Sequence, residues 1–96
     1  MAAYRAGKLV EAERALREVL RQHGTFAPAW QLLGLVAARA GRADEALRCL
    51  DRACFYAPTN GEILSHRAEL LRRAGHLKPA LECARQAVRF APDSAA

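Results

Sequence analysis

Residues 29–58 read AWQLLGLVAARAGRADEALRCLDRACFYAP and contain two amphipathic segments, separated by Gly41 and closed by Pro58. Apolar residues recur every three or four positions in both segments, which is the period of a helix with one buried face. The residue that follows a helix end often has a left-handed backbone conformation, which glycine adopts readily, and proline cannot continue a helix. The stretch therefore predicts two helices joined by a tight turn.

The same unit recurs on both sides of this stretch at an offset of 34 residues. The recurring positions are Gly7, Gly41 and Gly75; Ala6, Ala40 and Ala74; Ala12, Ala46 and Ala80; Arg5, Arg39 and Arg73; and Pro58 and Pro92. A fixed period of this length indicates a repeat architecture. We divide the chain into a single domain, residues 1–96, with a half repeat at 1–26 and full repeats at 27–60 and 61–94.

The apolar periodicity predicts helices over residues 9–22, 28–40, 44–56, 62–74 and 77–90. We interpret residues 2–6 as the last turn of a preceding helix that Gly7 ends. Glu13 and Arg17 are correctly ordered for a helical ion pair. Gly34 lies inside a predicted helix, where glycine costs about 1 kcal/mol relative to alanine, so we expect another helix to approach its backbone closely.

Composition and residue spacing exclude several kinds of function. The three cysteines include no CxxC pair, and the three histidines have neither metal-ligand spacing nor a nucleophile at a motif distance. We therefore expect no metal, no cofactor and no catalytic residue. No apolar run approaches the roughly 20 residues of a membrane span, and the first residues do not resemble a signal peptide, so we expect a cytoplasmic protein.

The 34-residue period, combined with W-x2-L-G, a later alanine and a closing proline, resembles the tetratricopeptide repeat. The second repeat matches this motif with Trp30, Leu33 and Gly34, and has Leu50 where an aromatic residue is usual. The third repeat matches less fully, because Leu64, Arg67 and Ala68 stand in the places of the tryptophan, the leucine and the glycine. The resemblance implies structural roles for Gly7, Ala12, Trp30, Leu33, Gly34, Gly41, Ala46, Ala53, Pro58, Gly75, Ala80, Ala87 and Pro92. Trp30 in particular is expected to pack between the two helices of its own repeat.

The resemblance also implies a fold and a function. The fold would be all-α, a right-handed α-solenoid of antiparallel helix pairs, in which the first helix of each pair lines a concave groove. Such repeats bind other proteins as extended peptides or single helices and do not catalyse reactions. Residues that share one helical stripe on these first helices are the implied partner-binding residues. They are Tyr4, Arg5, Gln31, Leu35, Ala38, Arg39, Glu62, Ser65, Glu69, Arg72 and Arg73.

Arg5, Arg39 and Arg73 occupy equivalent places on helices that should pack about 8 to 10 Å apart. Guanidinium groups bind carboxylates through two parallel hydrogen bonds, so one hypothesis is a groove for an acidic peptide or a C-terminal carboxylate. The net charge of +5 agrees with an anionic partner. The alternative is three solvated arginines near helix ends, where cations suit the helix dipole. The sequence leaves both open.

Apolar residues also mark both ends of the repeat array. A solenoid unit cannot bury its apolar face alone, so uncovered ends predict self-association or a segment of a longer repeat protein. The residues concerned are Leu9, Leu16 and Leu20 at the start and Leu81, Ala84, Val88 and Phe90 at the end.

Three functions follow from these patterns. The first is a scaffold or adaptor that binds another protein, with no membrane partner. The second is the repeat region of a larger enzyme, such as a glycosyltransferase, whose catalytic domain lies outside this chain. The third is RNA binding by a helical-repeat array, which the basic charge permits but the acidic groove residues Glu62 and Glu69 disfavour.

Overall fold

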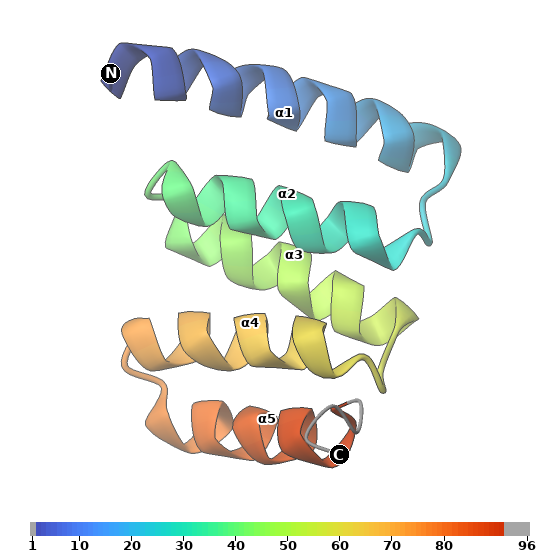
Figure 1. Cartoon of the computed structure of the whole chain (residues 1–96), viewed down its shortest axis with the longest axis vertical. Coiled ribbons are helices and arrows are strands. Elements are labelled where there is room, and N and C mark those ends of the chain that lie inside the picture. Colours follow the sequence, from blue (N-terminus) through green and yellow to red (C-terminus); the bar gives the residue numbers. More distant parts are fainter. Residues whose placement is uncertain (1, 92–96) are drawn as a thin grey trace.

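A computed structural model describes residues 2–91 of the chain, and their side chains from Gly7 onward. These residues form five helices and no strand: α1 (Ala2–Gln22), α2 (Ala27–Arg39), α3 (Ala43–Tyr56), α4 (Gly61–Arg73) and α5 (Leu77–Arg89). The helices lie side by side in chain order, and successive helices run in opposite directions (Figure 1). The fold is a right-handed α-solenoid of antiparallel helix pairs, as the sequence predicted.

The turns inside the two helix pairs share one geometry because each contains a glycine with a positive φ. Gly41 has a φ of 82° and Gly75 has a φ of 86°. The amide of Gly41 donates to the carbonyl of Ala38 at 3.1 Å, and that of Gly75 donates to Arg72 at 3.0 Å. These left-handed residues end α2 and α4 where the sequence predicted a helix end.

The interpretation of Gly7 as a helix terminator is wrong. α1 continues without a break from Ala2 to Gln22, so residues 2–6 extend this helix and do not end a separate one. A Cβ atom at Gly7 would meet nothing within 4 Å, so no neighbouring element forces a turn there. Continuing the helix keeps its backbone hydrogen bonds, and glycine inside a helix costs only about 1 kcal/mol.

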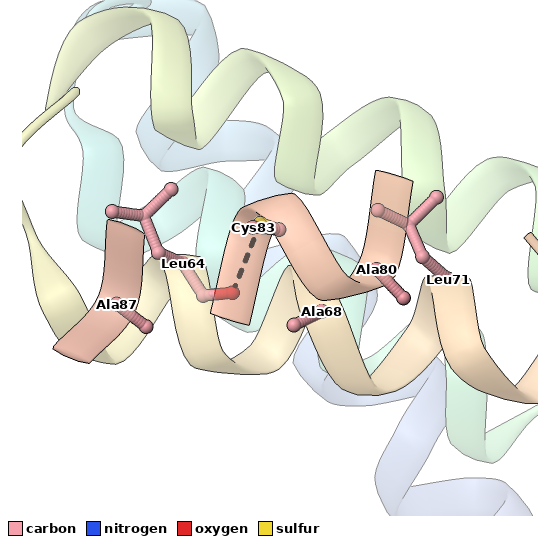
Figure 2. Close-up of a cluster of buried hydrophobic side chains, with 6 residues drawn as sticks. All are labelled: Leu64, Ala68, Leu71, Ala80, Cys83 and Ala87. Carbon is pink, nitrogen blue, oxygen red and sulfur yellow. Dashed lines mark hydrogen bonds between the residues drawn. The ribbon is translucent and has the colours of Figure 1, made fainter. Parts of the chain in front are cut away.

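Two clusters of buried side chains hold the stack together. The first joins α2, α3 and α4 through Ala27, Leu50, Ala53 and Ile63. The second lies between α4 and α5 and is built of Leu64, Ala68, Leu71, Ala80, Cys83 and Ala87 (Figure 2). In the second cluster the Cys83 thiol donates to the Leu64 carbonyl at 3.2 Å. Three of its six residues are alanines, which lets the two helices approach closely.

Gly34 provides the close helix approach that the sequence predicted. A Cβ atom placed there would lie 3.1 Å from the Ala46 carbonyl oxygen and 3.1 Å from Leu50 Cγ. Trp30 is half-buried and packs against the first cluster, as expected for a residue between α2 and α3. Its indole N–H also donates to the Gly24 carbonyl at 2.8 Å, which ties the α1–α2 loop to α2.

The other motif positions divide by burial. Five are buried in the helix interfaces: Leu33, Ala46, Ala53, Ala80 and Ala87. Ala12 is half-buried, and Pro58 is exposed just after α3. Pro92 lies outside the described residues.

Candidate protein-interaction site

A shallow depression of about 280 Å³ lies between α2 and α4. On each helix the lining residues are spaced by three or four positions or are direct neighbours, so each helix contributes one face. They are Leu35, Ala38 and Arg39 of α2 with His66, Glu69, Leu70 and Arg73 of α4. The first helices of the second and third repeats therefore share one groove, as the resemblance implied.

The charges of this depression are only partly neutralised within the chain. Arg73 Nε donates to Glu69 Oε2 at 2.9 Å, and Arg72 Nη2 donates to the same oxygen at 2.6 Å. Hydrogen bonds from Arg72 first, and then from Arg73, lower the pKa of Glu69 to about 2. Arg39 is exposed and forms no ion pair with the part of the chain that the structure describes. The depression thus holds one arginine that is already paired and one that is not.

Gln31 links the two helices that line the depression. Its side chain is buried, with 7% of the residue exposed. Nε2 donates to Glu62 Oε1 at 3.0 Å and lies 2.8 Å from His66 Nδ1, which accepts when the imidazole is neutral with its proton on Nε2. Gln31 therefore joins α2 to α4 through Glu62 and His66, and His66 is one of the residues that line the depression.

Four described residues that the sequence assigned to the groove do not line this depression: Gln31 and Glu62, which join its two helices, and Ser65 and Arg72. Ser65 and Arg72 line a second groove, between α4 and α5, and Glu69 borders both. The side chains of Tyr4 and Arg5 fall outside the described part, so two of the three proposed ladder arginines can be placed. His66 and Leu70 line the depression, although neither was among the predicted partner-binding residues. Helical spacing could have identified both residues, because they lie one and two turns after Glu62 on the same helix.

The second groove is larger, about 610 Å³, and lies along α4 and α5. Its most exposed apolar residues are Leu77, Leu81 and Val88, which are 65%, 55% and 79% exposed. The expectation of uncovered apolar side chains at this end is therefore confirmed for Leu81 and Val88. Phe90 differs, because it is half-buried against the cluster between α4 and α5.

At the other end of the stack, a network of ion pairs joins α1 to the start of α3. The predicted pair is present, with Arg17 Nη2 2.9 Å from Glu13 Oε2. Arg42 Nη2 also binds Glu13 Oε1 at 2.7 Å, and Arg17 reaches Glu45 at 2.9 Å. Hydrogen bonds from Arg42 and then Arg17 lower the pKa of Glu13 to about 2. Leu9, Leu16 and Leu20 are half-buried on the same helix.

Cys49 and Cys54 are in unreactive surroundings. Burial raises the pKa of the Cys54 thiol to about 11 and also raises the pKa of Cys49, so neither is a thiolate at neutral pH. Among residues 7–91, no three His, Cys, Asp or Glu side chains cluster in a way that could hold a metal ion. None of the helices described is both long and apolar enough to cross a membrane.

Comparisons with solved structures show the same architecture in longer proteins. A crystal structure of MamA matches with a TM-score of 0.82 and 19% identity, over 93% of this chain and 52% of that chain. A structure of MamA MSR-1 matches with a TM-score of 0.78 and 23% identity, over 86% of this chain and 48% of that one. The chain thus spans about half the length of these neighbours. At this level of identity the likeness shows the fold.

Sequence comparisons agree with the fold. None of the curated proteins compared with this sequence matches it. Two sequence models of the tetratricopeptide repeat match residues 3–54 and residues 32–95. Together they cover residues 3–95, which include α2 to α5 and all of α1 except its first residue. The chain therefore belongs to the tetratricopeptide repeat family, whose domains mediate protein–protein interactions.

Proposed function

We propose that this chain is an adaptor that binds a peptide or a single helix of a partner protein in the depression between α2 and α4. An acidic group of the partner binds Arg39 and Arg73, and an apolar side chain packs on Leu35 and Leu70. In this proposal the chain acts in the cytoplasm, takes no cofactor and catalyses no reaction itself. The observation that carries it is the exposed Arg39, which lies beside an apolar surface without an ion-pair partner in residues 7–91.

The two arginines should contribute unequally. A partner carboxylate that approaches Arg73 competes with Glu69, which already accepts a hydrogen bond from it at 2.9 Å. Arg39 has no such competitor, so its guanidinium can bind a carboxylate through two parallel hydrogen bonds at no loss of an internal contact. Replacing Arg39 should therefore weaken binding more than replacing Arg73.

The test is affinity capture followed by a measurement of the captured segment. The chain and its Arg39→Glu/Arg73→Glu variant are used as baits, and the bound segment of the partner is synthesised and titrated by calorimetry. Arg14→Glu/Arg48→Glu is the matched control. Both of these arginines are exposed and lie on α1 and α3, outside the depression, and the double substitution changes the net charge by the same amount as the groove variant. Circular dichroism confirms that each variant remains helical.

We expect the groove variant to lose the partner, with an affinity at least about tenfold weaker, and the control variant to retain it. Arg39→Ala should weaken binding more than Arg73→Ala. Equal binding by the wild type and the groove variant, or equal losses in both double variants, would exclude this depression as the binding site.

A further inference from the structure

The exposed face of α3 carries an aromatic side chain beside two arginines. A shallow hollow of about 410 Å³ on this face is lined by Arg48, Asp51, Arg52 and Phe55. None of these residues lines either of the two grooves described above, so this surface is separate from the depression between α2 and α4. We propose that it binds a short acidic segment of another protein, one with an aromatic side chain next to its carboxylates.

The position of α3 in the stack leaves this face uncovered. The buried residues Ala46, Leu50 and Ala53 mark the side of α3 that packs on its neighbours, and at about 3.6 residues per turn the hollow lies on the opposite side. α3 lies between α2 and α4 (Figure 1). Because each repeat contacts only the adjacent repeats, a helix added at either end of the stack would pack on α1 or α5. This face of α3 would stay exposed in a longer array.

Phe55 is a large apolar side chain in the middle of the stack, and it is 75% exposed. Its ring lies edge-on to that of Tyr56, with the centroids 5.2 Å apart and the ring planes at 78°. Tyr56 therefore positions the ring without covering most of it. Aromatic rings pack favourably in offset or edge-to-face arrangements, so an aromatic side chain of a partner can pack on the part of Phe55 that remains in water. Such contact removes apolar surface from water on both sides.

Arg48 and Arg52 lie one helical turn apart beside Phe55, and both are exposed. Neither forms an ion pair within residues 7–91, and the Asp51 carboxylate between them already accepts from Arg67 Nε at 2.6 Å. The guanidinium of Arg52 lies 5.8 Å from the centroid of the Trp30 ring, and this cation–π contact holds it in place. A side chain that is already positioned loses less conformational freedom on binding. The pair therefore suits carboxylates of a partner.

The arrangement favours a peptide over other anionic partners. Arg48 and Phe55 are about 10 Å apart along the helix axis, which about three residues of an extended peptide span. The Asp51 side chain is still 55% exposed between the arginines. A peptide offers backbone N–H groups to this carboxylate, whereas the sugar–phosphate backbone of a nucleic acid brings further negative charge to it.

The same charges disfavour a second copy of this chain as the occupant. Two copies that met through this face would bring Arg48 and Arg52 of one copy against those of the other, and like charges repel. An acidic segment of a different protein instead pairs with both arginines.

The test uses synthetic peptides as probes. The acidic peptide has glutamates followed by a phenylalanine. In one control peptide glutamines replace the glutamates, and in the other a serine replaces the phenylalanine. Binding to the 96-residue chain is measured by fluorescence anisotropy at low and high salt. The variants of the face are Arg48→Glu/Arg52→Glu and Phe55→Ser, and circular dichroism confirms that each remains helical.

Arg85→Glu/Arg89→Glu on α5 is the matched control. These arginines are exposed, lie one turn apart and change the net charge by the same amount. Arg89 also lies over a ring, 5.4 Å from the centroid of Phe90, as Arg52 does over Trp30. The control thus reproduces the charge and the ring contact but has no exposed aromatic side chain beside the pair.

Two further variants separate this surface from the depression. Arg39→Glu/Arg73→Glu should bind the acidic peptide like the wild type. Arg14→Glu/Arg48→Glu should bind it more weakly, because Arg48 belongs to this face, while it retains the segment bound in the depression. The failure of one site is therefore distinguishable from the failure of the other.

We expect Arg48→Glu/Arg52→Glu to bind the acidic peptide at least about tenfold more weakly, and Phe55→Ser at least about threefold more weakly. Arg85→Glu/Arg89→Glu should stay within about twofold of the wild type, and both control peptides should bind more weakly than the acidic one. Equal losses in the two double variants, equal binding of the acidic and glutamine peptides, or loss in Arg39→Glu/Arg73→Glu would overturn the proposal. Single-stranded RNA that binds tighter than the acidic peptide, or a dimer that Phe55→Ser dissociates in sedimentation equilibrium, would overturn it in favour of that occupant.

Discussion

Gly34 sets the distance between α2 and α3. The nearest atoms to a Cβ at this position are a backbone oxygen of α3 and Leu50 Cγ, both at 3.1 Å, with Cys49 Cβ at 3.3 Å. A backbone oxygen inside a packed helix cannot rotate away as a side chain can. Leu50 is itself fully buried, so it has little space into which to move. The glycine is therefore a packing requirement of the interface, and its lower helix propensity is the smaller effect.

Replacing Gly34 and Gly7 by alanine should have opposite effects on stability. Gly34→Ala is expected to destabilise the fold by about 1 to 3 kcal/mol, because overpacking outweighs the gain of about 1 kcal/mol in helix propensity. Gly7→Ala should stabilise by about 0.5 to 1 kcal/mol, since a Cβ there meets nothing within 4 Å. Urea denaturation followed by circular dichroism measures both. A Gly34→Ala variant as stable as the wild type would mean that α2 and α3 can move apart without a cost in folding free energy.

At the level of elements, α1 is joined to the rest of the stack by its apolar stripe and by a network of charges. Glu13 accepts from Arg17 on its own helix and from Arg42 just before α3. These donors hold its pKa at about 2 in the folded chain, against an ordinary value of 4.5. Because the folded pKa is lowered, the carboxylate contributes stability above about pH 4.5, and this contribution is lost as the pH falls towards about 2.

We therefore expect Glu13→Gln to change how stability depends on pH. The wild type should be more stable than the variant at neutral pH, and the difference should shrink as the pH falls from about 4.5 towards about 2. Chemical denaturation across this range gives the two curves. Glu11→Gln is the control, because Glu11 is exposed on the same helix and forms no ion pair in the described part. A difference that stays constant with pH would show that the network does not stabilise α1.

For the molecule as a whole, the stack is not uniformly packed. α2, α3, α4 and α5 each contain fully buried residues, whereas the residues of α1 from Gly7 onward are all partly or fully exposed. A repeat array behaves as a row of units that each contact only their neighbours, so a unit with less buried surface opens at lower free energy.

Native-state hydrogen exchange should show this gradient. The amides of α1 should exchange faster than those of α3 at the same pH, because α3 contains the fully buried Leu50 and Ala53. Mass spectrometry of peptic fragments is sufficient, because α1 and α3 lie in separate parts of the sequence and yield different fragments. Equal protection of α1 and α3 would mean that the five helices open as a single cooperative unit.

Local features of the sequence were enough to predict most of the fold. The four helices from α2 onward begin and end within one or two residues of the predicted bounds, because apolar periodicity and the turn glycines at 41 and 75 act over a few residues. The same reasoning gave the wrong prediction at Gly7, because a helix continues through glycine when no neighbouring element makes the chain turn. Gly34 was interpreted correctly, because a costly residue inside a helix indicates a close neighbour.

The interaction surfaces needed the tertiary structure. The sequence by itself determined that Leu35, Ala38 and Arg39 share one helical face. It did not determine that four of the five residues predicted on α4 divide between two grooves, with Ser65 and Arg72 in one, Arg73 in the other and Glu69 at both. Nor did it show which cations are already paired. Helical spacing orders residues around one axis, whereas grooves and ion pairs depend on the distances between helices, and only their packing decides those distances.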